Sequence, residues 1–307
     1  MPVPLLLHSL TEHQDLILDC LDVVGARQVV EVGSEFGGFT SALAAWAERT
    51  GGRSVAVEPF PAQEIRDLAG TCPSFTLLEG RSPGALREID LADAYVLDGD
   101  HTYWTVLHEL RVIAERAGDA QHPLVVLHDV GWPSGRRDQY YAPEELPAAA
   151  VHEHAWDAEV VPSVAGVVEQ GGWRGEGAFA LALHEGGPEN GVLTAVEDYL
   201  GESTADLAYA QVPSVFGLGV VYPRTAPWAP ALAALLGPWD RNAHLSRLEQ
   251  NRISLYLRVL TLQDESRVKA RVVTAYADRL AAAEAENAEL RLERLRRRAG
   301  DAAVDPL

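Results

Sequence analysis

The sequence is poor in cysteine and has no long apolar run. Two cysteines, Cys20 and Cys72, occur among 307 residues, which is too few for a disulfide framework or, by themselves, a zinc site. Their scarcity fits a reducing cytoplasm, where we expect the protein to be located. The N-terminal stretch MPVPLLLHSLTEHQ lacks a basic segment, and its apolar run is three leucines. We therefore expect neither a signal peptide nor a transmembrane span.

Positive charge is also scarce. The chain has 25 Lys and Arg against 45 Asp and Glu, a net charge of −20, so we expect neither nucleic acid nor an anionic membrane as a partner. The imbalance is uneven, because residues 241–300 hold 13 basic against 8 acidic residues while residues 1–240 hold 12 against 35. This difference predicts an acidic globular body followed by a differently built C-terminal segment.

Short apolar runs alternate with amphipathic segments along the body. We expect strands at 28–32, 54–58, 75–80, 94–98, 124–129, 177–185 and 215–223, and helices at 37–46, 62–68, 83–88, 102–116 and 191–200. Short apolar strands between amphipathic helices indicate an α/β fold with a doubly wound, mostly parallel sheet. Seven strands of this kind fit a sheet with a closing hairpin, and Gly219 in the last strand suggests an edge or a bulge.

Three segments are expected along the chain. They are an N-terminal helical segment (1–25), a body (26–238) with an insert or lid at 130–170, and a C-terminal helical extension (239–307). Residues 239–298 contain neither proline nor glycine. Residues at alternating spacings of four and three form a heptad-like seam, namely Tyr276, Leu280, Ala283, Asn287, Leu290 and Arg294. An earlier stripe comprises Leu245, Leu248, Leu255, Val259 and Leu262. Such a helix either packs back on its own domain or forms a hairpin or coiled coil; we expect it to make a homo-oligomer.

A glycine-rich turn follows the first expected strand. The stretch VVEVGSEFGGFT places Gly33, Ser34, Gly37 and Gly38 between strand and helix, where glycine permits a tight turn and close approach of a ligand. The spacing does not match the G-x-G-x-x-G pattern of dinucleotide sites. The next strand ends in Glu58, whose carboxylate can accept both hydroxyls of a ribose. Unless the turn merely needs glycine, these features predict a nucleoside without phosphates.

Two further strands end in acids and imidazoles. YVLDGDHTY begins at Tyr95, and LVVLHDV begins at Leu124. Adjacent strand tips at the ligand crevice should bring Asp98, His128 and Asp129 together. Facing carboxylates repel each other unless they are protonated or a cation lies between them. Oxygen ligands suit Mg²⁺, and an imidazole among them also suits Mn²⁺, Fe²⁺ or Zn²⁺.

The segments EVGSEFGG, VAVEP and YVLDGDH resemble class I S-adenosylmethionine-dependent methyltransferases, over about residues 25–225. The resemblance implies that the glycine turn passes the methionine part of the cofactor and that the acid ending the second strand binds its ribose. The cofactor-binding residues implied in this way are Glu31, Gly33, Ser34, Gly37, Glu58, Arg81, Ser82 and Asp98. Of these, Arg81 and Ser82 follow the third strand, where the family contacts adenine.

The DGDH motif is similar to that of metal-dependent O-methyltransferases, of the catechol type and more closely of the macrolide-sugar and cephalosporin-hydroxylase-like groups. This resemblance implies that Asp98, His128 and Asp129 hold a divalent metal, Mg²⁺ first, with Mn²⁺ or Fe²⁺ as alternatives. It also implies that His101 is the general base. His128 departs from the pattern, because an acid is more usual there. Asp100 either orients His101 or caps the helix that begins at Thr102, and we favour the cap.

The predicted function is therefore metal-dependent O-methylation of a small-molecule hydroxyl, in a sugar or another natural product. In the insert, Arg136, Arg137, Tyr140 and Tyr141, with Trp132 nearby, could clamp the substrate, or the insert could be a solvated loop. Two alternatives remain open at this point. The same fold could carry out N- or C-methylation or a metal-dependent oxidation, or the chain could be a non-catalytic assembly protein that uses its C-terminal helix.

Overall fold

The structure is a computed structural model that describes residues 9–118 and 121–301, with side chains through Arg297. The chain divides into two compact units, residues 1–257 and residues 258–307. The expected helix at the start of the chain consists of a 3-10 turn, η1 (Leu10–His13), and helix α1 (Gln14–Val24). Residues 1–8 of the expected N-terminal segment (1–25) lie outside the described residues.

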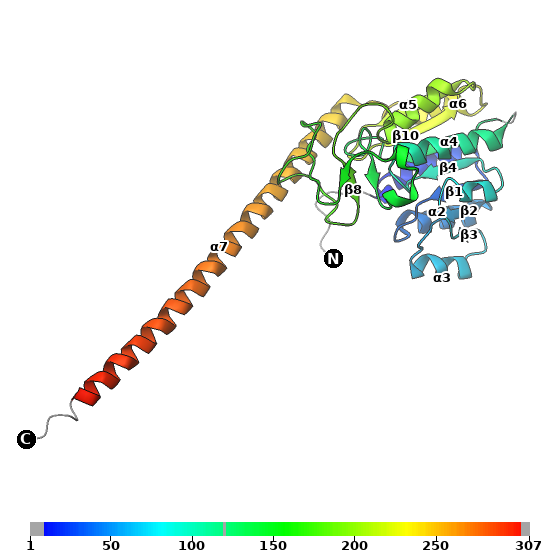
Figure 1. Ribbon diagram of the computed structural model, residues 1–307. Coiled ribbons are helices and arrows are strands. Elements are labelled where there is room, and N and C mark those ends of the chain that lie inside the picture. The colour runs from blue at the N-terminus through cyan, green and yellow to red at the C-terminus, as the bar shows by residue number, and fades with distance from the viewer. Residues whose placement is uncertain (1–8, 119–120, 302–307) are drawn as a thin grey trace, which may run out of the picture. The chain divides into compact units, whose positions relative to one another are not determined.

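The first unit is built on a seven-stranded sheet with the order β3-β2-β1-β4-β5-β10-β9. The strands are β1 (Gln28–Val32), β2 (Arg53–Val57), β3 (Phe75–Leu78), β4 (Ala94–Leu97), β5 (Leu124–His128), β9 (Leu207–Val212) and β10 (Leu218–Pro223). The first five run parallel, whereas β10 pairs antiparallel with both β5 and β9. The expected doubly wound, mostly parallel sheet and its closing hairpin are confirmed (Figure 1).

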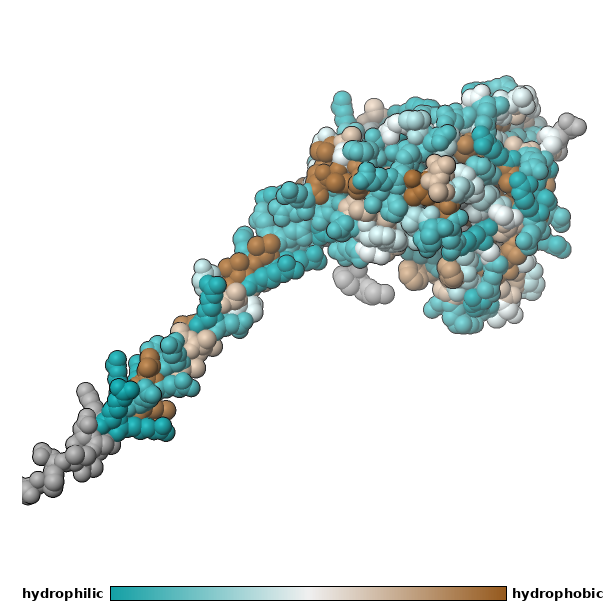
Figure 2. Space-filling view, in the orientation of Figure 1, coloured by the Kyte–Doolittle hydropathy of each residue, from teal (hydrophilic) through white to brown (hydrophobic). Residues whose placement is uncertain are grey.

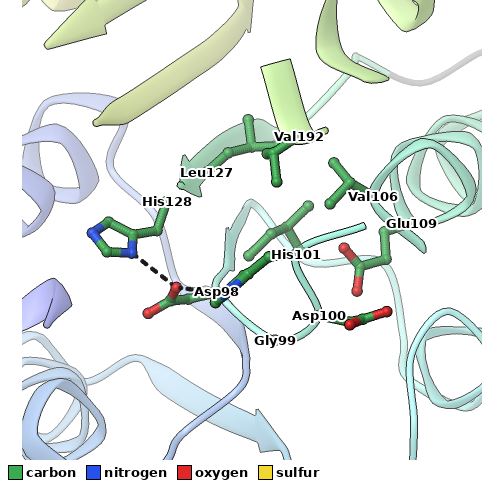
Figure 3. A pocket seen from close by; sticks show the side chains of 10 residues that line it. Asp98, Gly99, Asp100, His101, Val106, Glu109, Leu127, His128 and Val192 are labelled. Carbon is green, nitrogen blue, oxygen red and sulfur yellow. Dashed lines mark hydrogen bonds and ion pairs between the residues drawn. The ribbon is translucent and has the colours of Figure 1, made fainter. Parts of the chain in front are cut away.

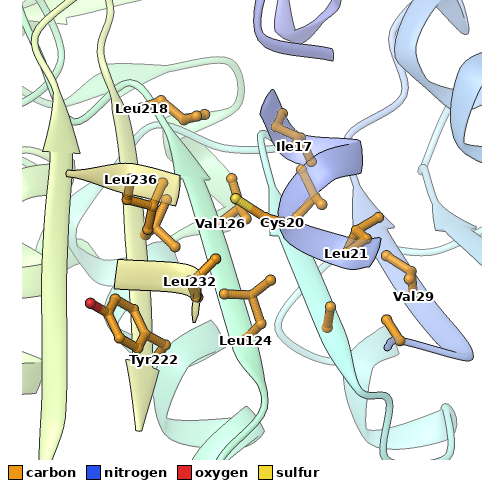
Figure 4. Close-up of a cluster of buried hydrophobic side chains, with 14 of the residues drawn as sticks. Ile17, Cys20, Leu21, Val29, Leu124, Val126, Leu218, Tyr222, Leu232 and Leu236 are labelled. Atoms are coloured by element: carbon orange, nitrogen blue, oxygen red, sulfur yellow. The ribbon is translucent and has the colours of Figure 1, made fainter. Parts of the chain in front are cut away.

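Helices cover both faces of the sheet. Helices α1, α2 (Gly38–Thr50), α3 (Gln63–Thr71) and α6 (Ala229–Leu236) pack on one face, and η2 (Ala85–Glu88), α4 (Tyr103–Ala117) and α5 (Val192–Glu202) on the other. Alternate residues of each strand face opposite layers, so Leu124 and Val126 meet Cys20 and Leu232 (Figure 4), while Val125 belongs to the other core. Every residue of β4 and β5 is buried, which explains their unbroken apolar runs.

The expected strand at 177–185 is wrong for the main sheet. Only β8 (Ala180–Ala182) forms there, in a separate three-stranded sheet with β6 (Gln139–Tyr140) and β7 (His154–Ala155). The missing strand of the main sheet is β9, an edge strand in which buried residues alternate with half-buried ones. Its sequence LAYAQV includes a tyrosine and a glutamine and is less continuously apolar than FALAL, so it does not stand out beside that run.

The position expected for Gly219 is also wrong. Strand β10 lies between β5 and β9, with an unbroken pairing register on both sides, so this glycine is at neither an edge nor a bulge. A Cβ atom there would come within 3.0 Å of the Tyr209 ring and of the Val130 side chain. Glycine is therefore favoured here, because any larger residue would need the Tyr209 and Val130 side chains to shift.

The insert after β5 is more ordered than a solvated loop. It contains β6, β7 and two 3-10 turns, η3 (Pro143–Glu145) and η4 (Ala148–Ala150). Its centre is Asp138, which has no solvent-exposed surface. One carboxylate oxygen of Asp138 accepts the backbone N–H groups of Tyr103, at 2.7 Å, and Gly191, at 2.8 Å. The insert is thus hydrogen-bonded to the N-terminal ends of α4 and α5.

The last element is helix α7 (Ala243–Asp301). Within the first unit, its residues Leu245, Ile253, Tyr256 and Leu257 pack against hydrophobic clusters of the body. The second unit, from Arg258 on, is the remainder of this helix as far as the structure describes it. Among the described residues there is no helix with the length and apolar character needed to cross a bilayer.

Candidate active site

The glycine turn between β1 and α2 lies against the end of β4. Gly33 has φ +84°, and a Cβ atom on it would be 2.2 Å from the backbone oxygen of Asp98. Any other residue would push the turn away from β4. Gly37 also has a positive φ of +79°, and Gly38 begins α2. The turn and the DGDH segment are therefore in direct backbone contact.

Glu58, just after β2, holds this turn through its carboxylate. One oxygen accepts the backbone N–H of Ser34 and the other that of Phe60, each at 3.0 Å. Carboxylate oxygens have further lone pairs, so these bonds leave capacity for a ligand hydroxyl. Glu58 therefore has a structural role that its position in the sequence did not reveal.

Several buried polar groups around the turn lack partners. The Oε2 atom of Glu31 and the hydroxyls of Ser34 and Thr40 form no hydrogen bond within the described part of the chain, although Glu31 is only 2% exposed. Burial raises the pKa of the Glu31 carboxyl to about 8. Buried polar atoms are normally paired, and an exception is expected where a ligand supplies the partner. The turn therefore has the unpaired groups that a polar cofactor would satisfy.

The two acid–imidazole strand ends converge as expected (Figure 3). His128 Nδ1 lies 3.0 Å from Asp98 Oδ1 and 2.9 Å from Asp129 Oδ2. His101 Nε2 lies 3.5 Å and 3.3 Å from the same two oxygens. His128 and Asp129 are buried, and Asp129 has a left-handed backbone with φ +60°. Aspartate is among the non-glycine residues that adopt this conformation most often, and here its carboxylate lies against His128 Nδ1.

The geometry fits a divalent cation. One atom each from Asp98, His128 and Asp129 can be chosen so that all three lie within 4.8 Å of one another. Neighbouring ligands of an octahedral Mg²⁺ are roughly 3 Å apart, because the bonds are about 2.0–2.1 Å long and meet at right angles. The two His128–carboxylate separations, 3.0 and 2.9 Å, have this length. The donor set of two carboxylates and one imidazole suits Mg²⁺, Mn²⁺ or Fe²⁺.

The same residues are electrostatically coupled. Burial by itself lowers the pKa of each histidine ring, but the adjoining carboxylates outweigh it and raise the pKa of His128, and that of His101 to about 9. Burial favours the neutral form of Asp98 as well, yet His128 and His101 bring its pKa down to about 2. Two carboxylates at this distance require positive charge between them, from protonated histidines or from a cation.

Comparison with known proteins decides the family of this region. Residues 30–130, which contain the glycine turn, Glu58 and the whole acid–imidazole cluster, match a family model described as a methyltransferase domain. The segment is a methyltransferase domain. The match covers residues 30–130 of the 307-residue chain, and it agrees with the class I S-adenosylmethionine-dependent methyltransferases that the motifs resemble. No curated protein matches the sequence.

Among solved structures, the chain is similar to the SAH-bound methyltransferase PaMTH1 of Podospora anserina, with 12% identity, 69% of this chain and 77% of that chain covered, and a TM-score of 0.43. It is also similar to a putative O-methyltransferase of Klebsiella pneumoniae, with 16% identity, coverages of 72% and 83%, and a TM-score of 0.40. For the SAM-bound O-methyltransferase TomG of Streptomyces achromogenes the identity is 14%, the coverages are 69% and 79%, and the TM-score is 0.40. We infer no function from likenesses this distant.

In the methyltransferase domain, His101 is held by a residue that sequence reasoning missed. The side-chain nitrogen of Gln139 lies 3.1 Å from His101 Nδ1 and 3.0 Å from the Tyr141 hydroxyl, to which it donates. The backbone N–H of Gln139 also donates to the His101 carbonyl, at 3.1 Å. Gln139 is buried, and it follows two arginines in a polar stretch that carried no sequence signal of its own. The insert thus positions His101 through both backbone and side chain.

Asp100 does not contact the His101 ring by any observed hydrogen bond in the described chain. Helix α4 is capped by Thr102, whose side chain accepts the N–H of Thr105 at 3.3 Å. Asp100 accepts hydrogen bonds from the hydroxyls of both threonines, at 3.0 and 2.6 Å. The capping residue is therefore Thr102 and not Asp100, which we favoured from the sequence. Asp100 supports the cap by accepting hydrogen bonds from the two threonine hydroxyls.

Arg81 and Ser82 lie after β3, but their side chains are engaged elsewhere. The Arg81 guanidinium pairs with Glu145 of the insert at 2.6 Å and lies over the ring of the exposed Phe60, 5.3 Å from its centre. The Ser82 hydroxyl donates to Glu109 of α4. These contacts connect the loop after β3 to the insert and to α4.

The substrate clamp expected from the insert is largely wrong. Arg137 is fully buried and donates to the carbonyls of Ala182 and Ala165, while Arg136 forms a two-bonded ion pair with Glu197 of α5. The hydroxyl of the buried Tyr140 donates to Asp138. Of these four expected clamp residues, Tyr141 alone contacts the acid–imidazole site, with its ring 5.7 Å from that of His101 in an edge-on arrangement. Both arginines stabilise the insert itself.

His13, in the N-terminal segment, also borders the acid–imidazole cluster. The ring of His13 is 6.0 Å from that of His128, and its Nε2 lies 3.2 Å from the hydroxyl of Ser214. Burial lowers the pKa of His13 to about 4, so its ring is neutral near pH 7. The single His in LTEHQ offered no motif that could have placed it there.

Proposed function

We propose that the protein is a divalent-metal-dependent O-methyltransferase acting on a hydroxyl of a small molecule. The observation that carries this proposal is the Asp98–His128–Asp129 ligand set, with His101 beside it, at the edge of the glycine turn. A hydroxyl must lose its proton before or during attack on a methyl group, and a cation held by two carboxylates and an imidazole would lower the pKa of that hydroxyl.

The cofactor is proposed to bind along the turn. Glu31, Gly33, Ser34 and Gly37 would face its methionine part, where the unpaired buried groups of Glu31 and Ser34 lie. Glu58 would accept the ribose hydroxyls, and Arg81 and Ser82 would border the adenine end, beside Phe60. Asp98 would lie between the cofactor and the other two proposed metal ligands, His128 and Asp129. When bound, S-adenosylmethionine supplies an electrophilic methyl group.

Asp98, His128 and Asp129 would hold the metal, with Mg²⁺ as the first choice and Mn²⁺ or Fe²⁺ as alternatives. When bound, the cation supplies positive charge that lowers the pKa of a nearby hydroxyl and fixes its position. The chain contributes a largely enclosed set of donors, in which His128 and Asp129 are buried, Asp98 is half-buried, and the Asp129 carboxylate lies 2.9 Å from His128 Nδ1. Tyr141 offers an aromatic edge beside this site.

His101 is proposed as the general base, with a bound cation, in place of a protonated ring, balancing the Asp98 and Asp129 carboxylates so that the His101 ring is neutral. In the structure the Gln139 amide donates to Nδ1, so a neutral ring carries its proton on Nε2, facing the carboxylates. Rotation of the Gln139 amide would present its oxygen to Nδ1, move the ring proton there and free Nε2 to accept a proton. An amide can support both tautomers, which a permanently charged neighbour could not do. Gln139 is therefore a positioning residue for the base.

The test is a search for methyl transfer with and without metal. The purified protein would be incubated with S-adenosylmethionine and a panel of hydroxylated metabolites, and products would be followed by mass spectrometry before and after chelation. We expect chelation to abolish turnover, Mg²⁺ or Mn²⁺ to restore it, and calorimetric binding of S-adenosylhomocysteine to persist throughout. Asp129→Asn should behave like the chelated enzyme, whereas the exposed Asp157→Asn serves as a matched control.

Each part of the proposal can fail separately. Absence of S-adenosylhomocysteine binding by the wild-type protein would contradict the cofactor assignment, and full turnover after exhaustive chelation would contradict the metal. The position of the new methyl group, read by NMR, distinguishes oxygen from nitrogen or carbon as the acceptor. If an oxidised product forms, and only with Fe²⁺, the reaction is a metal-dependent oxidation and the methylation proposal is wrong.

A further inference from the structure

The second unit exposes apolar side chains that a solitary helix would not be expected to carry. Between Val268 and Leu295 the large hydrophobic residues are 47–67% exposed, namely Val268, Val272, Val273, Tyr276, Leu280, Leu290, Leu292 and Leu295. Figure 2 shows these brown residues recurring along the helix among teal ones. Most helical stability in proteins comes from packing of an apolar face, so a helix of this length calls for a partner surface.

One set of these residues defines a heptad register. With Leu280 at position a, the a positions are Val273, Leu280, Asn287 and Arg294, and the d positions are Tyr276, Ala283 and Leu290. The seam is polar at Ser266 and Lys269, so pairing is expected mainly over residues 273–294. An asparagine at a single a position favours a parallel dimer, because it pairs best with the same residue on the partner helix.

The flanking charges agree with this orientation. In a parallel, in-register pair, each g residue faces the e residue of the next heptad on the partner helix. Arg279 at g would then face Glu284 at e, and Glu286 at g would face Arg291 at e. None of these four side chains makes an ion pair within the described residues, and so all are available. Two opposite-charge contacts would thus form on each side of the dimer.

The antiparallel alternative is disfavoured by the same residues. Antiparallel pairing brings g opposite g and e opposite e. In the register that places Leu280 against Leu290, Glu286 would face Glu286 and Glu284 would face Glu284 of the second copy. Asn287 would then lie against Ala283, where its amide finds no amide partner. The e and g charges between residues 279 and 291 and the pairing of Asn287 therefore favour the parallel arrangement, in which Arg294 at its a position faces a like charge.

We propose that residues 273–294 pair with the same residues of a second copy of this chain as a parallel, in-register coiled coil. The proposal does not depend on the chemistry of the active site. It accounts for the exposed seam, the lone asparagine within it and the pattern of flanking charges. Because a polar a position costs stability, the dimer is expected to dissociate measurably on dilution.

The first test measures molar mass of the full chain by light scattering and sedimentation over a range of concentrations. We expect a dimer that dissociates on dilution. Glu284→Arg combined with Glu286→Arg places like charges opposite each other and should shift the protein to monomer. The matched control, Asp278→Arg with Glu289→Arg, makes the same charge change at the outer f and c positions and should leave the dimer intact. Circular dichroism verifies that each variant stays folded. A wild-type protein that is monomeric at every concentration would overturn the proposal.

The second test reads orientation and register. In a Cys72→Ser background, Asn287→Cys places one thiol in the seam, where a parallel, in-register pair brings it next to its own counterpart. Mild oxidation should give a disulfide-linked dimer, whereas Ala285→Cys, on the outer face, should give little. Equal cross-linking at the two positions, or none at 287 in a protein that is dimeric by sedimentation, would exclude this geometry.

Discussion

Individual residues in this protein serve both structure and the proposed chemistry. Glu58 was expected only to receive a ribose, yet its two oxygens also fix the backbone of Ser34 and Phe60. His101 was expected as a base, yet it is also tied to the insert through Gln139. Variants at such positions therefore report on more than one interaction, and conservative substitutions are needed to separate them.

Replacement of His101 by alanine should lower the methyl-transfer rate by about 10²–10⁴-fold, the usual contribution of a general base. The residual rate should rise with pH, because hydroxide can take over removal of the proton. Metal binding and cofactor binding should be nearly unchanged. The exposed His244→Ala is a suitable control. An unaltered rate in His101→Ala would leave the metal alone to acidify the hydroxyl.

Replacement of Glu58 by alanine should weaken S-adenosylhomocysteine binding by roughly 1–3 kcal/mol, as expected when a charged acceptor is removed. Glu58→Gln keeps an acceptor oxygen and should have a smaller effect. Calorimetry on both variants separates the two roles of this residue. Equal affinities for wild type and Glu58→Ala would mean that the ribose is bound elsewhere.

At the scale of elements, the insert is connected to the sheet by buried polar groups. Asp138→Asn replaces one carboxylate oxygen by an amide nitrogen, so that either the oxygen accepting from the backbone N–H groups of Tyr103 and Gly191 or the one accepting from the Tyr140 hydroxyl is lost. We expect a loss of about 1–3 kcal/mol in the free energy of unfolding, because buried donors lose their partner. Urea denaturation measures it, with the exposed Asp157→Asn as control. Unchanged stability would show that the insert is held by its other contacts.

Helix α4 also carries a titratable group with a clear pH signature. Burial raises the pKa of the Glu109 carboxyl from its usual 4.5 to about 8. Between these values the unfolded chain has lost the proton that the folded chain keeps, so this group lowers stability as pH rises from about 4.5 to 8. Glu109→Gln should remove that contribution. The difference in melting temperature between variant and wild type should therefore grow over this range; a constant difference would refute the raised pKa.

The elements also show what sequence can and cannot predict here. The five parallel strands and the acid–imidazole tips of β4 and β5 were recognisable, because buried parallel strands are continuous apolar runs that end in polar residues. The edge strand β9 and the fold of the insert were not, because their stability depends on contacts between distant segments. Gln139 and His13 reach the site only through such contacts.

At the scale of the whole molecule, the two units have different kinds of surface. The first buries its apolar residues in cores on both faces of the sheet. The second leaves them exposed along one helix. The charge difference between residues 1–240 and 241–300 is an early sign of this division, since basic residues are denser in the C-terminal part of the sequence.

The contact between Gly33 and Asp98 has a thermodynamic consequence. Because the turn that would receive the cofactor touches the backbone of a proposed metal ligand, displacement of one displaces the other, and the two occupancies should be linked. Linkage is reciprocal, so the factor by which S-adenosylhomocysteine changes the dissociation constant of Mn²⁺ must equal the factor by which Mn²⁺ changes that of S-adenosylhomocysteine. We expect both factors to differ from one when the two titrations are carried out by calorimetry. If both factors equal one, the contact between Gly33 and Asp98 does not couple the two sites, and metal and cofactor bind independently.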